Sequence, residues 1–167
     1  FSKEFPPEDE VDLTHTYADG KLTWTEHAEF VDGQIHSLPG ENGATYLYRA
    51  IVSEEAAALV VSLGSRDGIQ VWLNGESVLA RNVARGVAPN QEHVRLDLIA
   101  GGNALLLKIN HGAGGGGFYF AVSQDQGDLE EVPFNKAYAD VSAEGFEVAA
   151  AIDGNPRTGW ASGSLDA

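Results

Sequence analysis

The sequence contains no cysteine and no methionine, and it has few basic residues: 10 Lys and Arg stand against 25 Asp and Glu, giving a net charge of −15 over 167 residues. The absence of cysteine excludes disulfides, thiol nucleophiles and thiolate metal sites. The acidic balance argues against nucleic acid and anionic lipid surfaces as partners, because no basic patch offsets it. No apolar run is long enough to span a bilayer, so we do not expect membrane insertion.

The residues that are present predict a globular module between acidic ends. Apolar residues make up 43% of the chain, which is enough for a hydrophobic core. The first twelve residues hold five acids against Lys3, and residues 123–167 hold nine acids against two bases, so most of the excess charge lies at the ends. The chain starts at Phe1 without an initiator methionine or a signal peptide, which favours a processed or excised piece of a larger protein.

The pattern of residues 44–123 predicts an all-β fold, an antiparallel β-sandwich, because short strands alternate with turn signals. The predicted strands are 44–53, 58–63, 69–74, 77–80, 94–98, 104–109 and 118–122. Asn74-Gly75 supplies the pair of positive φ angles that a tight hairpin requires. Residues 1–43 are less regular, with weak strand candidates at 22–25 and 31–36, and we predict that this segment wraps the sandwich.

A change in composition at Pro133 predicts a domain boundary there. The domains are then a sandwich module over residues 1–133, with its N-terminal wrapping segment, and a second unit over residues 134–167.

The run SLGSRDGIQVWLNG at 62–75 resembles the signature of PA14-type β-sandwiches, and it also resembles the sugar-binding jelly-roll domains attached to glycoside hydrolases. With RGVAP at 85–89, NALLLK at 103–108 and GFYF at 117–120, it is similar to a module of large secreted planctomycete proteins that also carry cytochrome c-like domains. The resemblance covers about residues 10–123. It implies a jelly-roll or PA14-like fold and an accessory, carbohydrate-binding module of an exported bacterial protein, located outside the cell, in the periplasm or at the cell surface.

Residues 151–162 (AIDGNPRTGWAS) resemble the early signature of discoidin, or factor 5/8 type C, domains. That family's domain is several times longer than residues 134–167, so this segment is the truncated start of such a domain, a tail docked on the sandwich, or disordered. Discoidin-like domains often hold structural calcium with the Asp and Thr of this motif, which implies Asp153 and Thr158 as metal ligands. The alternative is that the motif only forms turns.

The turn at Arg66-Asp67 is the first candidate binding site. In PA14-type lectins an Asp-Asp pair at this turn binds Ca²⁺, which in turn holds sugar hydroxyls, and calcium prefers six to eight oxygen ligands. The resemblance therefore implies Asp67 as a calcium ligand, although Arg66 replaces the second carboxylate; the alternative is that Asp67 caps the turn before Gly68. The planar guanidinium of Arg66 suits an anionic sugar substituent, either sulfate or carboxylate.

Three tryptophans, Trp24, Trp72 and Trp160, are candidate platforms for stacking on a pyranose ring. Trp24 lies in a polar stretch. Trp72 lies on the strand face opposite Val71 and Leu73, so it is either a platform on an open face or, as we favour, core beneath the N-terminal segment.

Asn110 and His111 precede a glycine-rich stretch, GAGGGG at 112–117. Glycine permits close approach of the backbone to another surface, at a cost in ordering entropy. The stretch is therefore either the rim of a binding site that includes Asn110 and His111 or a mobile connector without a ligand.

The sequence contains few residue patterns that are typical of catalytic sites. The five histidines show no metal-ligand spacing, no G-x-S-x-G elbow is present, and the abundant carboxylates are typical of solvated surface. We therefore predict no enzymatic activity. The leading functional hypothesis is polysaccharide binding, and the alternative is a structural spacer or protein–protein interaction module that packs against neighbouring domains of the parent chain. Aromatic rings exposed on one face would favour binding, whereas rings buried under residues 1–43 would favour the spacer.

Overall fold

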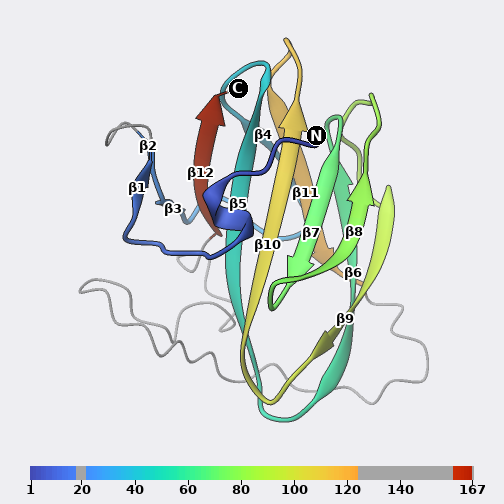
Figure 1. Ribbon diagram of the computed structural model, residues 1–167. Helices are drawn as coiled ribbons and strands as arrows, with labels where there is room; N and C mark the ends of the chain where they lie inside the picture. The colour runs from blue at the N-terminus through green and yellow to red at the C-terminus, as the bar shows by residue number, and fades with distance from the viewer. Residues whose placement is uncertain (18–21, 124–159, 167) are drawn as a thin grey trace.

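Two β-sheets packed face to face form the body of the protein (Figure 1). The computed structural model describes residues 1–17 and 22–123 and the backbone of residues 160–166. The elements in chain order are a short 3-10 helix, η1 (Pro6–Glu8), and the strands β1 (Thr16–Tyr17), β2 (Leu22–Thr23), β3 (Thr25–His27), β4 (Ile35–Leu38), β5 (Gly43–Ser53), β6 (Ala57–Ser65), β7 (Ile69–Leu73), β8 (Glu76–Arg81), β9 (Glu92–Leu98), β10 (Gly101–His111), β11 (Gly116–Val122) and β12 (Trp160–Asp166).

The larger sheet has the strand order β3-β12-β5-β10-β7-β8, the smaller sheet has the order β4-β11-β6-β9, and β1 pairs with β2 in a separate ribbon. The pairings among these strands are antiparallel. The predicted all-β, antiparallel sandwich is therefore confirmed. In the part of the chain that the structure describes, no helix has the length and apolar character needed to cross a membrane.

The strands predicted between residues 44 and 123 correspond to β5–β11, with differences at their ends. Asn74 (φ 52°) and Gly75 (φ 81°) form the predicted two-residue turn between β7 and β8. Gly101-Gly102-Asn103 is a turn signal in the sequence, which would lead into the predicted strand 104–109, but β10 already begins at Gly101, because this residue pairs with Ser53 of β5. Likewise β11 begins at Gly116, inside the glycine-rich stretch.

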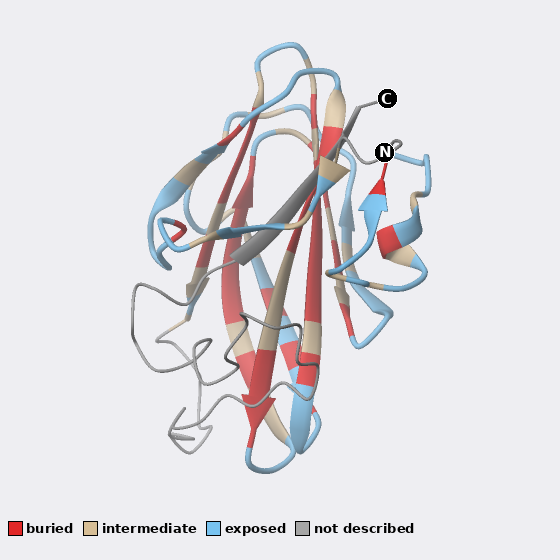
Figure 2. Cartoon of the chain, turned by 90° about the vertical axis from the view of Figure 1, so that its left-hand side faces the viewer, coloured by how far each residue is buried: buried red, intermediate tan, exposed pale blue. Residues whose placement is uncertain are grey.

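The hydrophobic core fills the space between the two sheets. Alternating side chains of β6, such as Leu59, Val61 and Leu63, belong to one buried cluster with Leu105 and Leu107 of β10. Figure 2 shows the buried stretches in red along the strands. Since burying one large aliphatic side chain stabilises a fold by about 1.5–3 kcal/mol, this layer is the main source of stability.

The N-terminal segment covers the outer face of the larger sheet with a second apolar cluster, called the outer cluster below. Its buried members are Tyr17, Ala44, Tyr46 and Leu106, and Phe5, Val11, Leu22, Trp24, Tyr48 and Trp72 pack against them. Tyr48, Leu106 and Trp72 lie side by side on β5, β10 and β7. The Trp72 ring is therefore half-buried among apolar neighbours rather than open to solvent.

A buried ion pair anchors the N-terminal segment to this face. The Lys108 ammonium donates to Glu8 Oε1 at 2.7 Å and to the carbonyl of Lys3 at 2.5 Å, and the Lys108 side chain is 1% exposed. The Tyr46 hydroxyl donates to the same Glu8 oxygen, as does the backbone N–H of Phe5. Removing two charges from water is costly, so the pair depends on this full set of partners.

We expect the free energy of unfolding to fall as the pH rises above about 10. Burial and then the hydrogen bond to Glu8 raise the pKa of the Tyr46 phenol above its ordinary value of 10.0. A group whose pKa is raised on folding contributes stability that is complete below its unfolded-state pKa and is lost as the pH rises toward the folded-state value. Urea unfolding between pH 8 and 11 measures this decline in the free energy of unfolding. A single titrating group lowers the free energy by at most about 1.4 kcal/mol per pH unit. Tyr46→Phe should make it shallower, and an unchanged slope would contradict the assignment.

β12 lies between β3 and β5 in the larger sheet (Figure 1). Its backbone pairs residues 161–166 with residues 43–48 of β5 and residues 160–162 with β3. The boundary predicted at Pro133 lies outside the described residues and stays a prediction.

Candidate functional site

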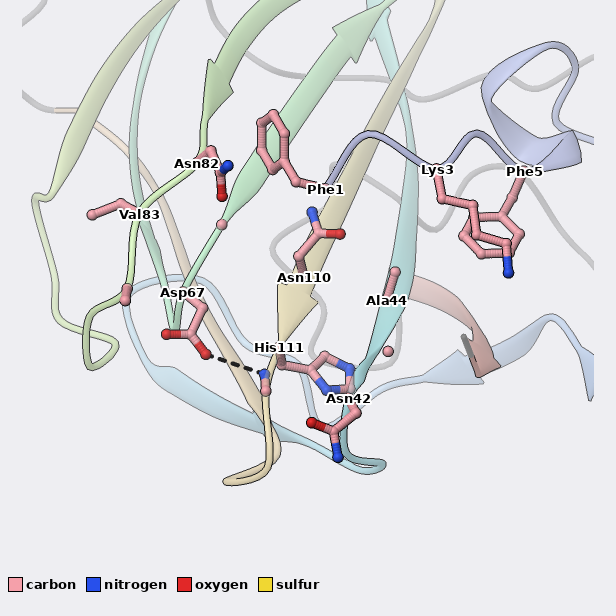
Figure 3. Close-up of a pocket in the computed structure, with 14 residues that line it drawn as sticks. Phe1, Lys3, Phe5, Asn42, Ala44, Asp67, Asn82, Val83, Asn110 and His111 are labelled. Atoms are coloured by element: carbon pink, nitrogen blue, oxygen red, sulfur yellow. Dashed lines mark hydrogen bonds between the residues drawn. The ribbon is translucent and has the colours of Figure 1, made fainter.

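A pocket of about 510 Å³ lies at the end of the sandwich where β5 begins and β10 ends (Figure 3). The N-terminal segment, the β4–β5 loop, the β6–β7 turn, the β8–β9 loop and the last residues of β10 surround it. The lining residues are Phe1, Lys3, Phe5, Asn42, Gly43, Ala44, Asp67, Gly68, Asn82, Val83, Ala84, Asn110, His111 and Gly112. The volume is in the range of small-molecule sites, which is about 300–1,000 Å³.

The ends of β5 and β10, two central strands of the larger sheet, form the floor of this pocket. Asn110 of β10 lies opposite Ala44 of β5, and its backbone N–H donates to the carbonyl of Gly68 at 2.8 Å. Residues two apart on a strand share a face, so the Asn110 side chain lies on the same outer face as Lys108. The pocket is therefore the open end of the surface that the N-terminal segment covers.

Asp67 connects the loops that surround the pocket. Its Oδ1 accepts the backbone N–H of Arg85 at 3.1 Å, and its Oδ2 accepts the backbone N–H of Gly112 at 3.2 Å. Its own N–H donates to the carbonyl of Arg85 at 3.0 Å, and the residue has a left-handed φ of 59°. Asp67 thus ties the β8–β9 loop and the β10–β11 turn to the β6–β7 turn.

His111 is a buried wall residue. The side chain is 5% exposed, and its Nε2 lies 3.1 Å from the Thr45 hydroxyl of the neighbouring strand. A Cβ on Gly116 would lie 2.8 Å from the imidazole ring, so glycine at this position gives the ring its space. Several glycines of this stretch are therefore packed closely against their neighbours, and its role as the rim of a binding site stays a prediction.

Asn110 brings an unpaired donor to the pocket. Its Nδ2 is buried and has no hydrogen-bond partner among the described residues. Figure 3 shows its amide between Phe1 and His111. A buried amide N–H without a partner costs about 1–3 kcal/mol, which a ligand oxygen would recover.

Phe1 and Lys3 form the wall contributed by the N-terminal segment. A Cβ on Gly68 would lie 3.0 Å from the Phe1 ring, so the ring rests directly on the glycine backbone. The Lys3 ammonium lies 4.9 Å from the centre of the Phe5 ring. The sequence did not identify these residues, because only the docking of the segment brings them near Asp67. For the β4–β5 loop the sequence offers the turn signals Pro39-Gly40 and Asn42-Gly43, and Gly40 (φ 88°) and Asn42 (φ 53°) both have left-handed backbone.

The structure brings three of the six predicted ligand-binding residues, Asp67, Asn110 and His111, into this pocket. Trp24 packs against Tyr48 in the outer cluster at a ring-centroid distance of 6.3 Å, and Trp72 belongs to the same cluster. These two tryptophans therefore do not form an open platform together with the pocket.

Arg66 does not line the pocket but lies beside it. Its side chain is exposed, and a Cβ on Gly114 would collide with its guanidinium. The guanidinium thus lies on the β10–β11 turn, two residues from Gly112 of the pocket wall.

The predicted calcium sites remain predictions. Within residues 1–17 and 22–123, no group of three or more His, Asp or Glu side chains is arranged to hold a metal ion. Asp153 and Thr158 lie outside the described residues, so the discoidin-like site falls there as well.

The sandwich with a pocket among its end loops defines a β-sandwich module, and two solved structures are similar to it. The PA14 domain of the MpAFP antifreeze protein is 21% identical with a TM-score of 0.43, over 55% of this chain and 49% of that one. A β-glucosidase from Kluyveromyces marxianus, solved in complex with glucose, is 24% identical with a TM-score of 0.39, over 48% of this chain and 10% of that one. The chain thus spans about half of the antifreeze-protein structure that it matches. No family model and no curated protein matches the sequence.

Proposed function

We propose that this protein is a non-catalytic carbohydrate-binding module of a larger exported bacterial protein and that the pocket is its sugar site. The proposal rests on the pocket, where Asp67, Asn110 and His111 meet from distant parts of the sequence. Small-molecule sites combine apolar walls with a few placed polar groups, and the ring of Phe1 beside the Asn110 amide has this character. An aromatic ring suits the apolar face of a pyranose.

The presence of a single carboxyl group among the lining residues supports binding rather than catalysis. Glycoside hydrolysis ordinarily requires two carboxyl groups on opposite sides of the scissile bond. Asp67 is the one acidic residue among those that line the pocket, and both of its oxygens accept backbone N–H groups.

A second candidate function is a spacer or interaction module that packs against neighbouring domains and binds no sugar. The packing of Trp24 and Trp72 in the outer cluster favours it, because covered rings are unable to stack on a polysaccharide. The two functions differ in their dependence on the pocket, which only a sugar-binding module needs.

A glycan array with the whole chain, in calcium and in EDTA, tests the proposal. We expect retention on at least one glycan, equally in both buffers, because the Asp67 oxygens are engaged by the protein and no carboxylate cluster accompanies them within the described residues. Retention on no glycan would overturn the proposal in favour of the spacer. Retention only in calcium would show that a metal ion takes part, and Asp67→Ala and Asp153→Ala would then distinguish the two predicted calcium sites.

Asn110→Ala should weaken glycan binding about tenfold without lowering the free energy of unfolding, because the Nδ2 that it removes has no partner among the described residues. Asn103, on the same strand, is the matched control. Its side chain bonds to Ile99, Gly101 and Asn74, so Asn103→Ala should destabilise the fold by about 2 kcal/mol. Titration calorimetry and urea unfolding of both variants separate the two effects. A destabilised Asn110→Ala with unchanged affinity would contradict the binding role.

A further inference from the structure

Most of the described lysine and arginine side chains form ion pairs with Asp or Glu, but two of them do not. Among the described residues, five lysine and arginine side chains form ion pairs: Arg49 with Asp32, Arg81 and Arg85 with Glu92, Arg95 with Asp97, and Lys108 with Glu8. Lys3 and Arg66 complete the described set, and neither forms an ion pair with a described residue. Among the described lysine and arginine residues, the two without an anionic partner are therefore the two that lie at the pocket end.

Each of the two cations is held in place without being neutralised. Lys3 lines the pocket wall, with its ammonium over the Phe5 ring and its carbonyl bound by Lys108. Arg66 lies on the turn beyond Gly112, with its guanidinium over Gly114. Both side chains are exposed, so a ligand that fills the pocket and crosses this turn can reach both.

The one carboxylate that lines the pocket is hydrogen-bonded by the protein. The carboxylate of Asp67 accepts two backbone N–H groups, and these bonds lower its repulsion of a second anion. Glu4 and Glu41 are exposed on the adjoining segments and do not line the pocket. The Asn110 Nδ2 donor and the two cations are therefore available to a ligand at this end of the described sandwich.

We propose that the ligand is an acidic polysaccharide, whose carboxylate or sulfate substituents contact Lys3 and Arg66 while one sugar ring occupies the pocket. This inference rests on the proposed carbohydrate-binding function and names its substrate class. A guanidinium and an ammonium bind both kinds of oxyanion, so the experiment must distinguish the two.

The test uses the whole chain and two matched pairs of probes: polygalacturonate against its methyl ester, and dextran sulfate against dextran. We expect one acidic probe to bind at least tenfold more tightly than its neutral partner. Lys3→Gln and Arg66→Gln should each weaken that binding about fivefold. Arg95→Gln, which removes the same charge from the outer face of the smaller sheet, should change it less than twofold.

The outcomes separate this inference from the proposed function. Preference for polygalacturonate assigns a carboxylate ligand, and preference for dextran sulfate assigns a sulfate ligand. Equal affinity for a neutral probe and its acidic partner overturns the inference and leaves a neutral sugar site. Equal losses in Lys3→Gln, Arg66→Gln and Arg95→Gln would also overturn it, because binding would then follow net charge rather than the pocket. Absence of binding to all four probes and to the glycan array overturns both proposals.

Discussion

Replacing Glu8 by glutamine is expected to lower the free energy of unfolding by about 3 kcal/mol, because it leaves the Lys108 ammonium buried without a counter-charge. The Lys108 side chain is 1% exposed and that of Glu8 is 11% exposed, so water is unable to replace the lost carboxylate. Glutamine keeps an oxygen for Tyr46 and Phe5, which isolates the loss of charge from the loss of hydrogen bonds. Urea unfolding at pH 7 measures the change.

Glu10→Gln, two residues along the same segment at an exposed position, is the control and should shift the stability by less than about 0.5 kcal/mol. The double variant Glu8→Gln with Lys108→Met should recover most of the loss, since the amide keeps an oxygen for Tyr46 and Phe5 and no buried charge remains without a partner. A loss below about 1 kcal/mol in Glu8→Gln, or no recovery in the double variant, would show that the pair is solvated.

The body of the sandwich was predictable because its signals are local. The alternation of apolar residues in β7 and the Asn74-Gly75 turn set the strand face and the hairpin within a few residues. These local signals are less informative where pairing with a distant strand decides the structure. Gly101 reads as a turn residue in isolation, and only its partner Ser53 on β5 makes it part of a strand.

The N-terminal anchor was not predictable, for a physical reason. Glu8 and Lys108 are separated by 100 residues, and each residue alone is typical of a solvated surface. Their pairing exists only because the N-terminal segment docks on the outer face. The same docking packs Trp72 beneath the N-terminal segment, the alternative that the sequence favoured, and it brings Phe1 and Lys3 to the pocket, where the sequence did not place them.

The candidate site was predictable in part. Asp67 is identified through the resemblance of its turn to the calcium-binding turn of PA14-type lectins, and Asn110 and His111 are identified because they precede a glycine-rich stretch. Their convergence follows from the β10–β7 pairing, which places Asn110 beside Gly68 and hence beside Asp67. The binding role of these residues stays a prediction, since their identity alone does not distinguish a ligand contact from a loop anchor.

Asp67→Ala is expected to lower the free energy of unfolding by about 3 kcal/mol and to abolish measurable glycan binding. The substitution removes the acceptor of two backbone N–H groups, those of Arg85 and Gly112, and places a Cβ without a local hydrogen bond at a φ of 59°. The two lost bonds account for about 2 kcal/mol and the left-handed backbone for about 1 kcal/mol.

Two further variants separate these contributions. Asp67→Gly relieves the backbone strain, so it should be less destabilised than Asp67→Ala by about 1 kcal/mol while losing binding to the same extent. Asn42→Ala carries the same strain at a φ of 53° without a side-chain hydrogen bond to lose, so it should cost only about 1 kcal/mol. If Asp67→Gly kept full affinity, the loops would hold the pocket without Asp67, and the residue would be a turn residue only. If Asp67→Ala and Asn42→Ala lost the same free energy while Asp67→Gly lost none, strain alone would explain Asp67, and the two bonds that join the β8–β9 loop and the β10–β11 turn would add nothing to the stability of the site.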